Sequence, residues 1–367
     1  MNIDMDQRRT PLIENHLALH ARVITFAGWE MPLQFSGIIE EVRAVRSAAG
    51  LFDVSHMGRV EISGPTASFL LNRVFSTDVA QLKVGRARYG VICNQEGGII
   101  DDCIVYRLGS QRFMLVPNAS NTSTVIEWLS RCEERDDEVS VEDTTPRQAM
   151  IALQGPTAAK MLGGLTELGL DKLRTFWATE TAVSGVHTIL ARTGYTGEEG
   201  FELMIAVEDA PTVWELLIAA GATPCGLGAR DVLRLEAGLL LHGNDMNTSI
   251  NPYEAGLERF VDPDRDEYVA GEALRGIRES GWSRTLVGFN MIGRGIARHA
   301  HPIMSGTKRI GEVSSGSYSP TLDRNIGLGY VPTSCSALGT RFHVDVRGRS
   351  VEAEVTKLPF YSWKKGI

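Results

Sequence analysis

The 367-residue sequence lacks the features that mark several large classes of protein. Its five cysteines (Cys93, Cys103, Cys132, Cys225 and Cys335) show no paired spacing, which favours reduced thiols over disulfides or a zinc site. No apolar run approaches the roughly 20 residues of a membrane span. Basic residues number 37 against 45 acidic ones, and the resulting net charge of −8 argues against a nucleic-acid groove. The first residues, Met1–Arg9, have neither a secretory apolar core nor an arginine-rich amphipathic start, so we expect a cytoplasmic protein.

Short catalytic signatures are missing as well. The chain has no His-Glu-x-x-His, no P-loop and no Rossmann glycine fingerprint. Ser55-His56 suggests a hydrolase, but no Gly-x-Ser-x-Gly elbow accompanies it, and we interpret His56 as structural. We expect no metal site.

The pattern that is present predicts an α+β fold with two or three domains. Apolar residues recur at helical spacing between Ile38 and Ala49, and a second helix opens after Pro65. Three runs, Tyr89–Cys93, Ile104–Arg107 and Arg112–Val116, predict an antiparallel meander. Long βαβ periodicity is absent, which disfavours a doubly wound sheet.

Past Ser283 the pattern changes to short strands with turns, which is typical of a small β-barrel. The expected strands are 286–289, 309–313, 326–330, 342–346 and 351–355. A charged stretch from Asp262 to Trp282, with a helix expected over 270–277, is the best boundary. We therefore predict one region over residues 1–275 and a barrel domain over 284–362.

The most informative single segment runs from Gly97 to Tyr106. The glycine pair Gly97-Gly98 predicts a hairpin turn, followed by two aspartates and an apolar strand. Neighbouring strand residues point to opposite faces, so Asp101 and Asp102 have different tasks. Alone, the segment also fits an ordinary Asp-rich turn, with Asp101 tying down that turn.

This segment is one of several short sequence motifs that occur along nearly the whole chain in the order seen in one protein family. The chain resembles the glycine cleavage system T protein, an aminomethyltransferase. The matching phrases are Phe26-Ala27-Gly28-Trp29-Glu30-Met31-Pro32, Gly50-Leu51-Phe52-Asp53-Val54-Ser55-His56-Met57-Gly58, Gly97–Asp102, Leu153-Gln154-Gly155-Pro156, Arg192-Thr193-Gly194-Tyr195-Thr196-Gly197-Glu198, Gly200-Phe201-Glu202, Gly228-Ala229-Arg230-Asp231, Gly293-Arg294-Gly295-Ile296, Ser319-Pro320-Thr321-Leu322 and Lys357-Leu358-Pro359-Phe360.

The resemblance implies a three-domain cloverleaf around a folate channel, with two interleaved α+β domains in residues 1–275 and the C-terminal β-barrel after them. It implies an enzyme that takes an aminomethyl group from the lipoyl arm of H protein. Tetrahydrofolate, as co-substrate, accepts the one-carbon unit and ammonia is released. Neither a membrane nor a nucleic acid is an expected partner.

The resemblance also implies site residues. Asp102 is the expected catalytic carboxylate, near the folate amine nitrogens. Glu202 is expected to bind the pterin; without the resemblance it is a solvated residue at a strand start. Arg230 is expected to bind folate, and its alternative is an ion pair with Asp231 or Glu236. Tyr195, Tyr89, Tyr106 and Asn118 are further expected folate contacts, although aromatic residues more commonly pack in cores.

Three departures from the family pattern leave the donor open: Thr25, Thr77 and Arg259. One alternative is a folate-dependent demethylase of a small N-methyl or S-methyl compound, which needs no H protein. Another is a non-catalytic folate-binding accessory protein.

Overall fold

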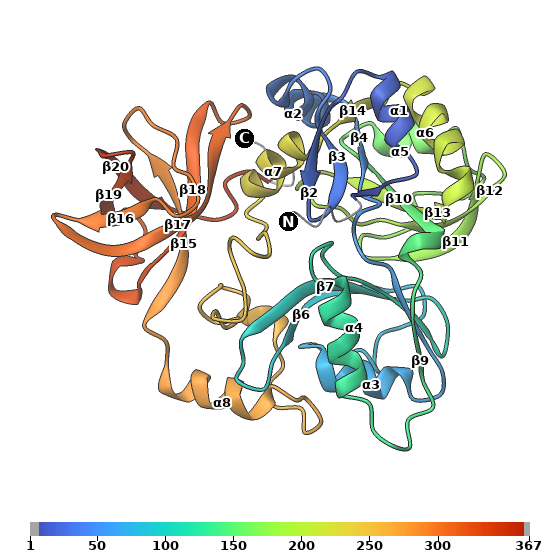
Figure 1. Cartoon of the computed structure of the whole chain (residues 1–367), viewed down its shortest axis with the longest axis horizontal. Coiled ribbons are helices and arrows are strands. Elements are labelled where there is room, and N and C mark those ends of the chain that lie inside the picture. Colours follow the sequence, from blue (N-terminus) through green and yellow to red (C-terminus); the bar gives the residue numbers. More distant parts are fainter. Residues whose placement is uncertain (1–6, 363–367) are drawn as a thin grey trace, which may run out of the picture. The chain divides into compact units, whose positions relative to one another are not determined.

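A computed structural model describes residues 7–362 (Figure 1). The first six residues, part of the segment behind the cytoplasmic expectation, lie outside the described residues. The chain forms two compact units. The first contains residues up to 72, 78–89 and 103–230, and the second contains 73–77, 90–102 and the chain from 231 onward.

A six-stranded sheet is the centre of the first unit. Its strand order is β11 (Ala178–Val183), β12 (Val186–Ala191), β13 (Gly200–Ala206), β10 (Gln148–Gln154), β4 (Gly50–Asp53) and β14 (Thr223–Cys225). The central strands β4, β10 and β13 are almost wholly buried, because helices pack against the sheet. These helices are α1 (Ile13–Ala18), α2 (Ile38–Ser47), α5 (Ala158–Gly163) and α6 (Ala210–Ala219). Their core includes Leu12, Leu51, Ile151, Leu153, Leu162, Trp214 and Leu217.

A five-stranded sheet contains the predicted meander. Its order is β6 (Ala87–Cys93), β7 (Ile99–Arg107), β8 (Arg112–Val116), β5 (Val60–Ser63) and β9 (Ser140–Asp143). The consecutive neighbours β6, β7 and β8 confirm that prediction. Helices α3 (Ala67–Val74) and α4 (Thr122–Arg131) lie in the same stretch of chain, and a small sheet joins β1 (Arg8–Arg9), β3 (Trp29–Gln34) and β2 (Arg22–Phe26). Mixed helices and mainly antiparallel strands confirm the α+β class.

The second unit contains the predicted barrel, drawn orange to red in Figure 1. The closed order is β15 (Arg284–Met291), β18 (Arg324–Pro332), β17 (Lys308–Ser319), β16 (Pro302–Ser305), β19 (Arg341–Val346) and β20 (Arg349–Thr356). Phe289 and Phe342 meet edge to face in its core, with ring centroids 5.4 Å apart. Five strands were expected; β16 is an additional one. Proline opens this four-residue strand, and it is too short to show an alternating pattern.

The remaining elements connect these sheets. Helix α7 (Leu227–Glu236) follows β14, and α8 (Gly271–Ser280) confirms the helix expected in the charged stretch. Four short 3₁₀ turns are η1 (Thr145–Arg147), η2 (Val207–Asp209), η3 (Glu258–Phe260) and η4 (Thr333–Cys335). In residues 7–362, every helix is too short or too polar to cross a membrane.

A buried ion pair joins α1 to β4 in the first unit. His16 Nε2 lies 2.8 Å from Asp53 Oδ2, and both side chains are fully buried. Burial alone raises the pKa of Asp53, but the hydrogen bond and charge of His16 outweigh it and lower that pKa to about 2. The pair therefore stabilises the fold most when Asp53 is ionised.

We predict that Asp53→Asn lowers the free energy of unfolding at pH 7 by about 2 kcal/mol. The folded pKa lies below the ordinary value, so this stabilisation is present above about pH 4 and is lost as the pH falls toward 2. Thermal unfolding at pH values from 2.5 to 7 measures this contribution. The fall in stability toward low pH should be shallower in Asp53→Asn than in the wild type. Exposed Asp171→Asn is the control; equal pH dependence in wild type and Asp53→Asn contradicts the prediction.

Candidate functional site

The two aspartates lie on β7, directly after a tight turn in the second unit. Asn94 closes this turn: its side chain accepts the Gly98 amide at 2.7 Å, and its backbone exchanges bonds with Gly97 and Gly98. Gly97 has φ of +84°, a conformation that favours glycine. Asp101 is completely buried, whereas Asp102 is half-buried. The predicted hairpin is confirmed, and alternation along β7 separates the two carboxylates as expected.

Glu202 is the third residue of β13 and is only 5% exposed. The interpretation of Glu202 as a solvated residue is therefore wrong. Its Oε2 accepts hydrogen bonds from the hydroxyls of Thr193 and Tyr106, at 2.5 and 3.3 Å. Burial and the Glu202 charge hold the pKa of Tyr106 well above its usual value, so the phenol stays a donor. Among residues 7–362, Glu202 Oε1 has no hydrogen-bond partner and is available to accept donors.

The loop before β13, residues 192–199, is held by hydrogen bonds from two side chains, Gln154 and Arg46. Gln154 Nε2 donates to the Thr193 carbonyl at 3.1 Å, and its Oε1 accepts the Thr196 hydroxyl at 2.9 Å. Arg46 binds the Thr196 carbonyl at 2.8 Å and the Glu198 carboxylate at 3.0 Å. A Cβ on Gly194 would lie 1.9 Å from Gln154 Oε1, so the close approach requires glycine. These contacts fix the loop that carries Tyr195.

Arg230, from α7, lies over the ring of Tyr195, with its guanidinium carbon 4.7 Å from the ring centroid. Burial lowers the pKa of Arg230, while the neighbouring Tyr195 and Glu202 raise it. Arg230 is thus close enough to Glu202 for their charges to interact. The alternative partner Asp231 pairs instead with Arg234, at 2.8 Å. The structure therefore brings together four predicted residues: Tyr106, Tyr195, Glu202 and Arg230.

His56 is buried beside this group, with its ring edge-on to Phe26 at 5.7 Å. Burial, together with the Arg230 charge, lowers the pKa of His56 to about 3. The imidazole is therefore neutral at physiological pH, and its structural role stays a prediction.

The other predicted residues lie on other elements of the chain. Tyr89 is half-buried on β6, and Asn118 follows β8, where its carbonyl accepts the Asn121 amide at 2.9 Å. Asp102 belongs to the second unit. Their part in one common site with Glu202 stays a prediction.

The three departures from the family pattern have separate surroundings. Thr25 is exposed on β2 and accepts a hydrogen bond from Gln7 at 2.8 Å. Arg259 is exposed on η3, over the Phe260 ring. The Thr77 hydroxyl is buried and has no hydrogen-bond partner within the described residues.

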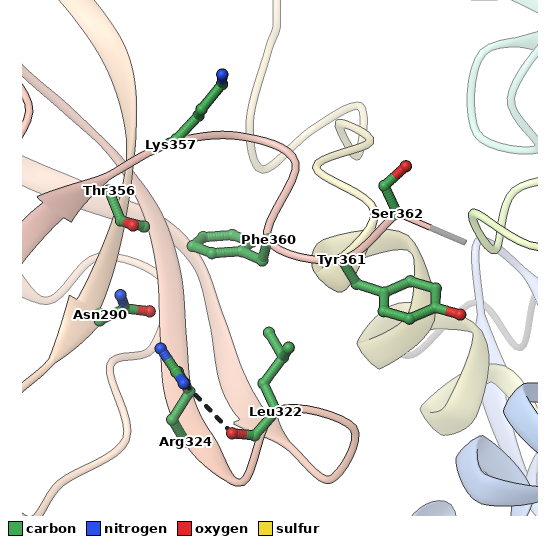
Figure 2. A pocket seen from close by; sticks show the side chains of 8 residues that line it. All are labelled: Asn290, Leu322, Arg324, Thr356, Lys357, Phe360, Tyr361 and Ser362. Atoms are coloured by element: carbon green, nitrogen blue, oxygen red, sulfur yellow. Dashed lines mark hydrogen bonds between the residues drawn. The ribbon is translucent and has the colours of Figure 1, made fainter. Parts of the chain in front are cut away.

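A cavity of about 250 Å³ lies beside the barrel in the second unit. Figure 2 shows the Phe360 ring among the lining side chains and the Arg324 hydrogen bond to the Leu322 carbonyl, 3.3 Å long. Its other lining residues are Asn290, Thr356, Lys357, Tyr361 and Ser362. No residue predicted for the site lines this cavity.

The Glu202 cluster suits a planar ligand rich in N–H groups. One carboxylate oxygen is fixed by two hydroxyls, the other is available, and a guanidinium–aromatic pair stands nearby. Within residues 7–362, no three His, Cys, Asp or Glu side chains are arranged to hold a metal ion. None of the five cysteines, all within residues 7–362, forms a disulfide.

Sequence reasoning missed Thr193 and Gln154 as parts of this cluster, although both lie in phrases quoted for the resemblance. Their spacing gives no signal of their role, because each acts through a residue distant in sequence. Proximity of Gln154 to the glycines of the 192–200 loop is visible only in the fold.

Comparison with known proteins covers nearly the whole chain. Residues 12–265 match the model of the GCVT N-terminal domain, and residues 284–362 match that of the glycine cleavage T-protein C-terminal barrel domain. An aminomethyltransferase of Symbiobacterium thermophilum is 47% identical over 96% of this chain and 97% of its own. One from Rubrobacter xylanophilus is 46% identical over 98% and 95%.

A solved structure agrees with these sequence matches. The crystal structure of glycine cleavage system aminomethyltransferase T from Bartonella henselae superposes with a TM-score of 0.91, at 34% identity over 97% of this chain and 98% of that one. This match confirms the predicted fold class. The chain belongs to the glycine cleavage T-protein family.

Proposed function

We propose that this chain is an aminomethyltransferase that moves the one-carbon unit from the aminomethyl-lipoyl arm of H protein to tetrahydrofolate, with release of ammonia. Its full-length relatives named aminomethyltransferase support this reaction and confirm that the chain is an enzyme. The structural observation that carries the proposal is the Glu202 cluster, whose free carboxylate oxygen, guanidinium and aromatic ring fit a pterin. Residues 1–275 are the proposed folate-binding region and 284–362 the proposed barrel domain of a cytoplasmic enzyme.

Each side chain has a proposed task. Glu202 Oε1 accepts N–H groups from the aminopyrimidine edge, and Oε2 is held by Thr193 and Tyr106. Arg230 and Tyr195 flank the ligand as a cation and an aromatic face. Tyr89 and Asn118 are proposed as further folate contacts.

Asp102 is the proposed catalytic group. A carboxylate beside the folate amine nitrogens stabilises developing positive charge and takes or returns a proton there. The enzyme otherwise contributes proximity and exclusion of water rather than a covalent nucleophile.

Purified enzyme should form methylenetetrahydrofolate from tetrahydrofolate and aminomethylated H protein. Dimethylglycine and dimethylsulfoniopropionate are assayed in parallel as small methyl donors. Turnover with H protein alone supports the proposal. Turnover only with a small donor makes the chain a demethylase, and no turnover with any of them makes it a folate-binding accessory protein.

We predict that Glu202→Gln weakens tetrahydrofolate binding by about 10- to 100-fold, because the amide is neutral and one of its two ends is an NH2 donor in place of a carboxylate oxygen that accepts. Turnover at saturating folate should change less. Equilibrium titration measures the affinity. Tyr106→Phe is the comparison variant, because it removes the hydroxyl that contacts Oε2 and the Thr193 hydroxyl and leaves the carboxylate itself unchanged; equal losses in both variants contradict a direct role for Oε1.

A further inference from the structure

The Thr193 hydroxyl lies between two other buried oxygen groups of the first unit. Tyr106 is fully buried, and Thr193 and Glu202 are each 5% exposed. Thr193 Oγ1 lies 2.5 Å from Glu202 Oε2 and 3.0 Å from the Tyr106 hydroxyl. An ionised carboxylate only accepts hydrogen bonds, so the Thr193 proton is donated to Glu202. The lone pairs of Thr193 Oγ1 then remain for Tyr106.

The Tyr106 phenol has one proton and two neighbouring acceptors. Thr193 Oγ1 is the nearer acceptor at 3.0 Å, and Glu202 Oε2 is the farther one at 3.3 Å. Burial and the Glu202 charge raise the pKa of Tyr106, so the phenol keeps its proton. The hydroxyls of Tyr106 and Thr193 therefore donate in series toward Oε2, and each bond in such a chain polarises the next.

Gln154 fixes the backbone on both sides of this contact. Its side chain is 1% exposed, and Nε2 donates to the Thr193 carbonyl at 3.1 Å and to the Phe201 carbonyl at 3.4 Å. Phe201 is the residue before Glu202 on β13. A Cβ on Gly200 would lie 2.5 Å from Gln154 Nε2, so glycine makes room for the amide here as well. One buried amide thus holds the backbone of Thr193 beside that of Glu202.

This arrangement restricts the Glu202 carboxylate before any ligand arrives. The terminal torsion of a glutamate is broad when nothing holds the carboxylate. The charge-assisted bond from Thr193 holds Oε2, and the position of Oε1 follows from it. A group that is already oriented loses less freedom when it binds a ligand, which increases affinity.

We propose that Thr193 is a positioning residue for Glu202. Its hydroxyl, reinforced by Tyr106 and placed by Gln154, orients the carboxylate so that Oε1 meets the N–H groups of a planar ligand. That this ligand is the pterin of tetrahydrofolate rests on the proposed function. Tyr106 acts on the ligand through Thr193.

The first test is tetrahydrofolate binding by the full chain with Thr193→Val, which has the shape of threonine but no hydroxyl. We expect the Kd to rise about tenfold, because Glu202 loses the bond that orients it. Turnover at saturating tetrahydrofolate should change less than about threefold, since the loss falls on binding. Thr193→Ser keeps the hydroxyl and should restore a Kd within about twofold of the wild type.

Thr188→Val is the matched control for loss of a buried threonine hydroxyl. Thr188 is fully buried on β12, and its hydroxyl donates to the Val186 carbonyl at 3.0 Å. This variant should bind tetrahydrofolate with the wild-type Kd, whatever its thermal stability. A wild-type Kd in Thr193→Val, or a Kd in Thr193→Ser as high as in Thr193→Val, overturns the proposal.

A double-mutant cycle tests the order of the hydroxyls. Tyr106→Phe should raise the Kd about threefold in the wild type and have a smaller effect in Thr193→Val, because Tyr106 acts through the missing hydroxyl. The same four chains are unfolded with denaturant in the absence of ligand. Their losses of unfolding free energy should be smaller together than the sum of the two single losses. Additive losses in the cycle overturn the series of bonds.

The outcomes for the wild type separate this inference from the proposed function. A wild type that binds tetrahydrofolate but turns over none of the three donors contradicts the proposed transfer reaction, and the Kd comparisons still decide the role of Thr193. A wild type that does not bind tetrahydrofolate contradicts the proposed folate function. The unfolding cycle of Tyr106 and Thr193 then decides alone whether the two hydroxyls act in series on Glu202.

Discussion

Asp102→Asn should lower turnover by about 100- to 1000-fold while tetrahydrofolate still binds. The amide has the shape of the carboxylate but can neither carry its negative charge nor take a proton. Asp102 is half-buried on β7, so the substitution leaves the packing of the strand intact. Methylenetetrahydrofolate formation with aminomethylated H protein measures turnover, and folate titration of the same preparation measures binding.

Asp101→Asn is the matched comparison, one residue away on the same strand. Asp101 is completely buried, and its face of β7 is the opposite one. We expect this variant to lose thermal stability and soluble yield more than turnover of the folded fraction. Full turnover in Asp102→Asn, or an equal loss of turnover in both variants, contradicts the assignment of Asp102 as the catalytic residue.

Local patterns predicted the parts of the fold whose signal is contained in a few neighbouring residues. The glycine pair and the apolar run from Ile104 to Tyr106 specify a hairpin and a strand, and both form. Short apolar runs separated by turns in the last part of the chain predicted five of the six barrel strands. This pattern missed β16, a four-residue strand that pairs along its length with β17 and through Ile303 and Met304 with β19.

The site could be predicted only in part, since its contacts are made across long stretches of sequence. Family phrases indicated Glu202, Arg230 and Tyr195, and the fold brings these together in the first unit. Thr193 and Tyr106 fix one oxygen of Glu202, a relation that no local spacing encodes.

The largest effect on stability is expected at Arg59, a wholly buried cation between β4 and β5 in the first unit. Its guanidinium donates to four backbone carbonyls, those of Ser55, Met57, Thr145 and Gln148. Burial lowers the pKa of Arg59 to about 10, against the opposing charges of Asp53 and Asp143, so the side chain remains protonated at neutral pH. The Arg59 guanidinium therefore joins the 54–59 loop to η1 and to the first residue of β10.

Arg59→Met should lower the free energy of unfolding by about 4 kcal/mol. The methionine side chain has no N–H group, so the four buried carbonyls lose their hydrogen-bond donor. Denaturant unfolding measures the loss, and hydrogen exchange should rise first in peptides covering 54–59 and 145–150. Arg147→Met is the matched control: that side chain is 63% exposed and pairs with Glu142 at the surface, so we expect less than about 1 kcal/mol. Similar losses in the two variants would show that the carbonyl cluster tolerates solvent, and that the connection between β4, β5 and β10 does not depend on Arg59.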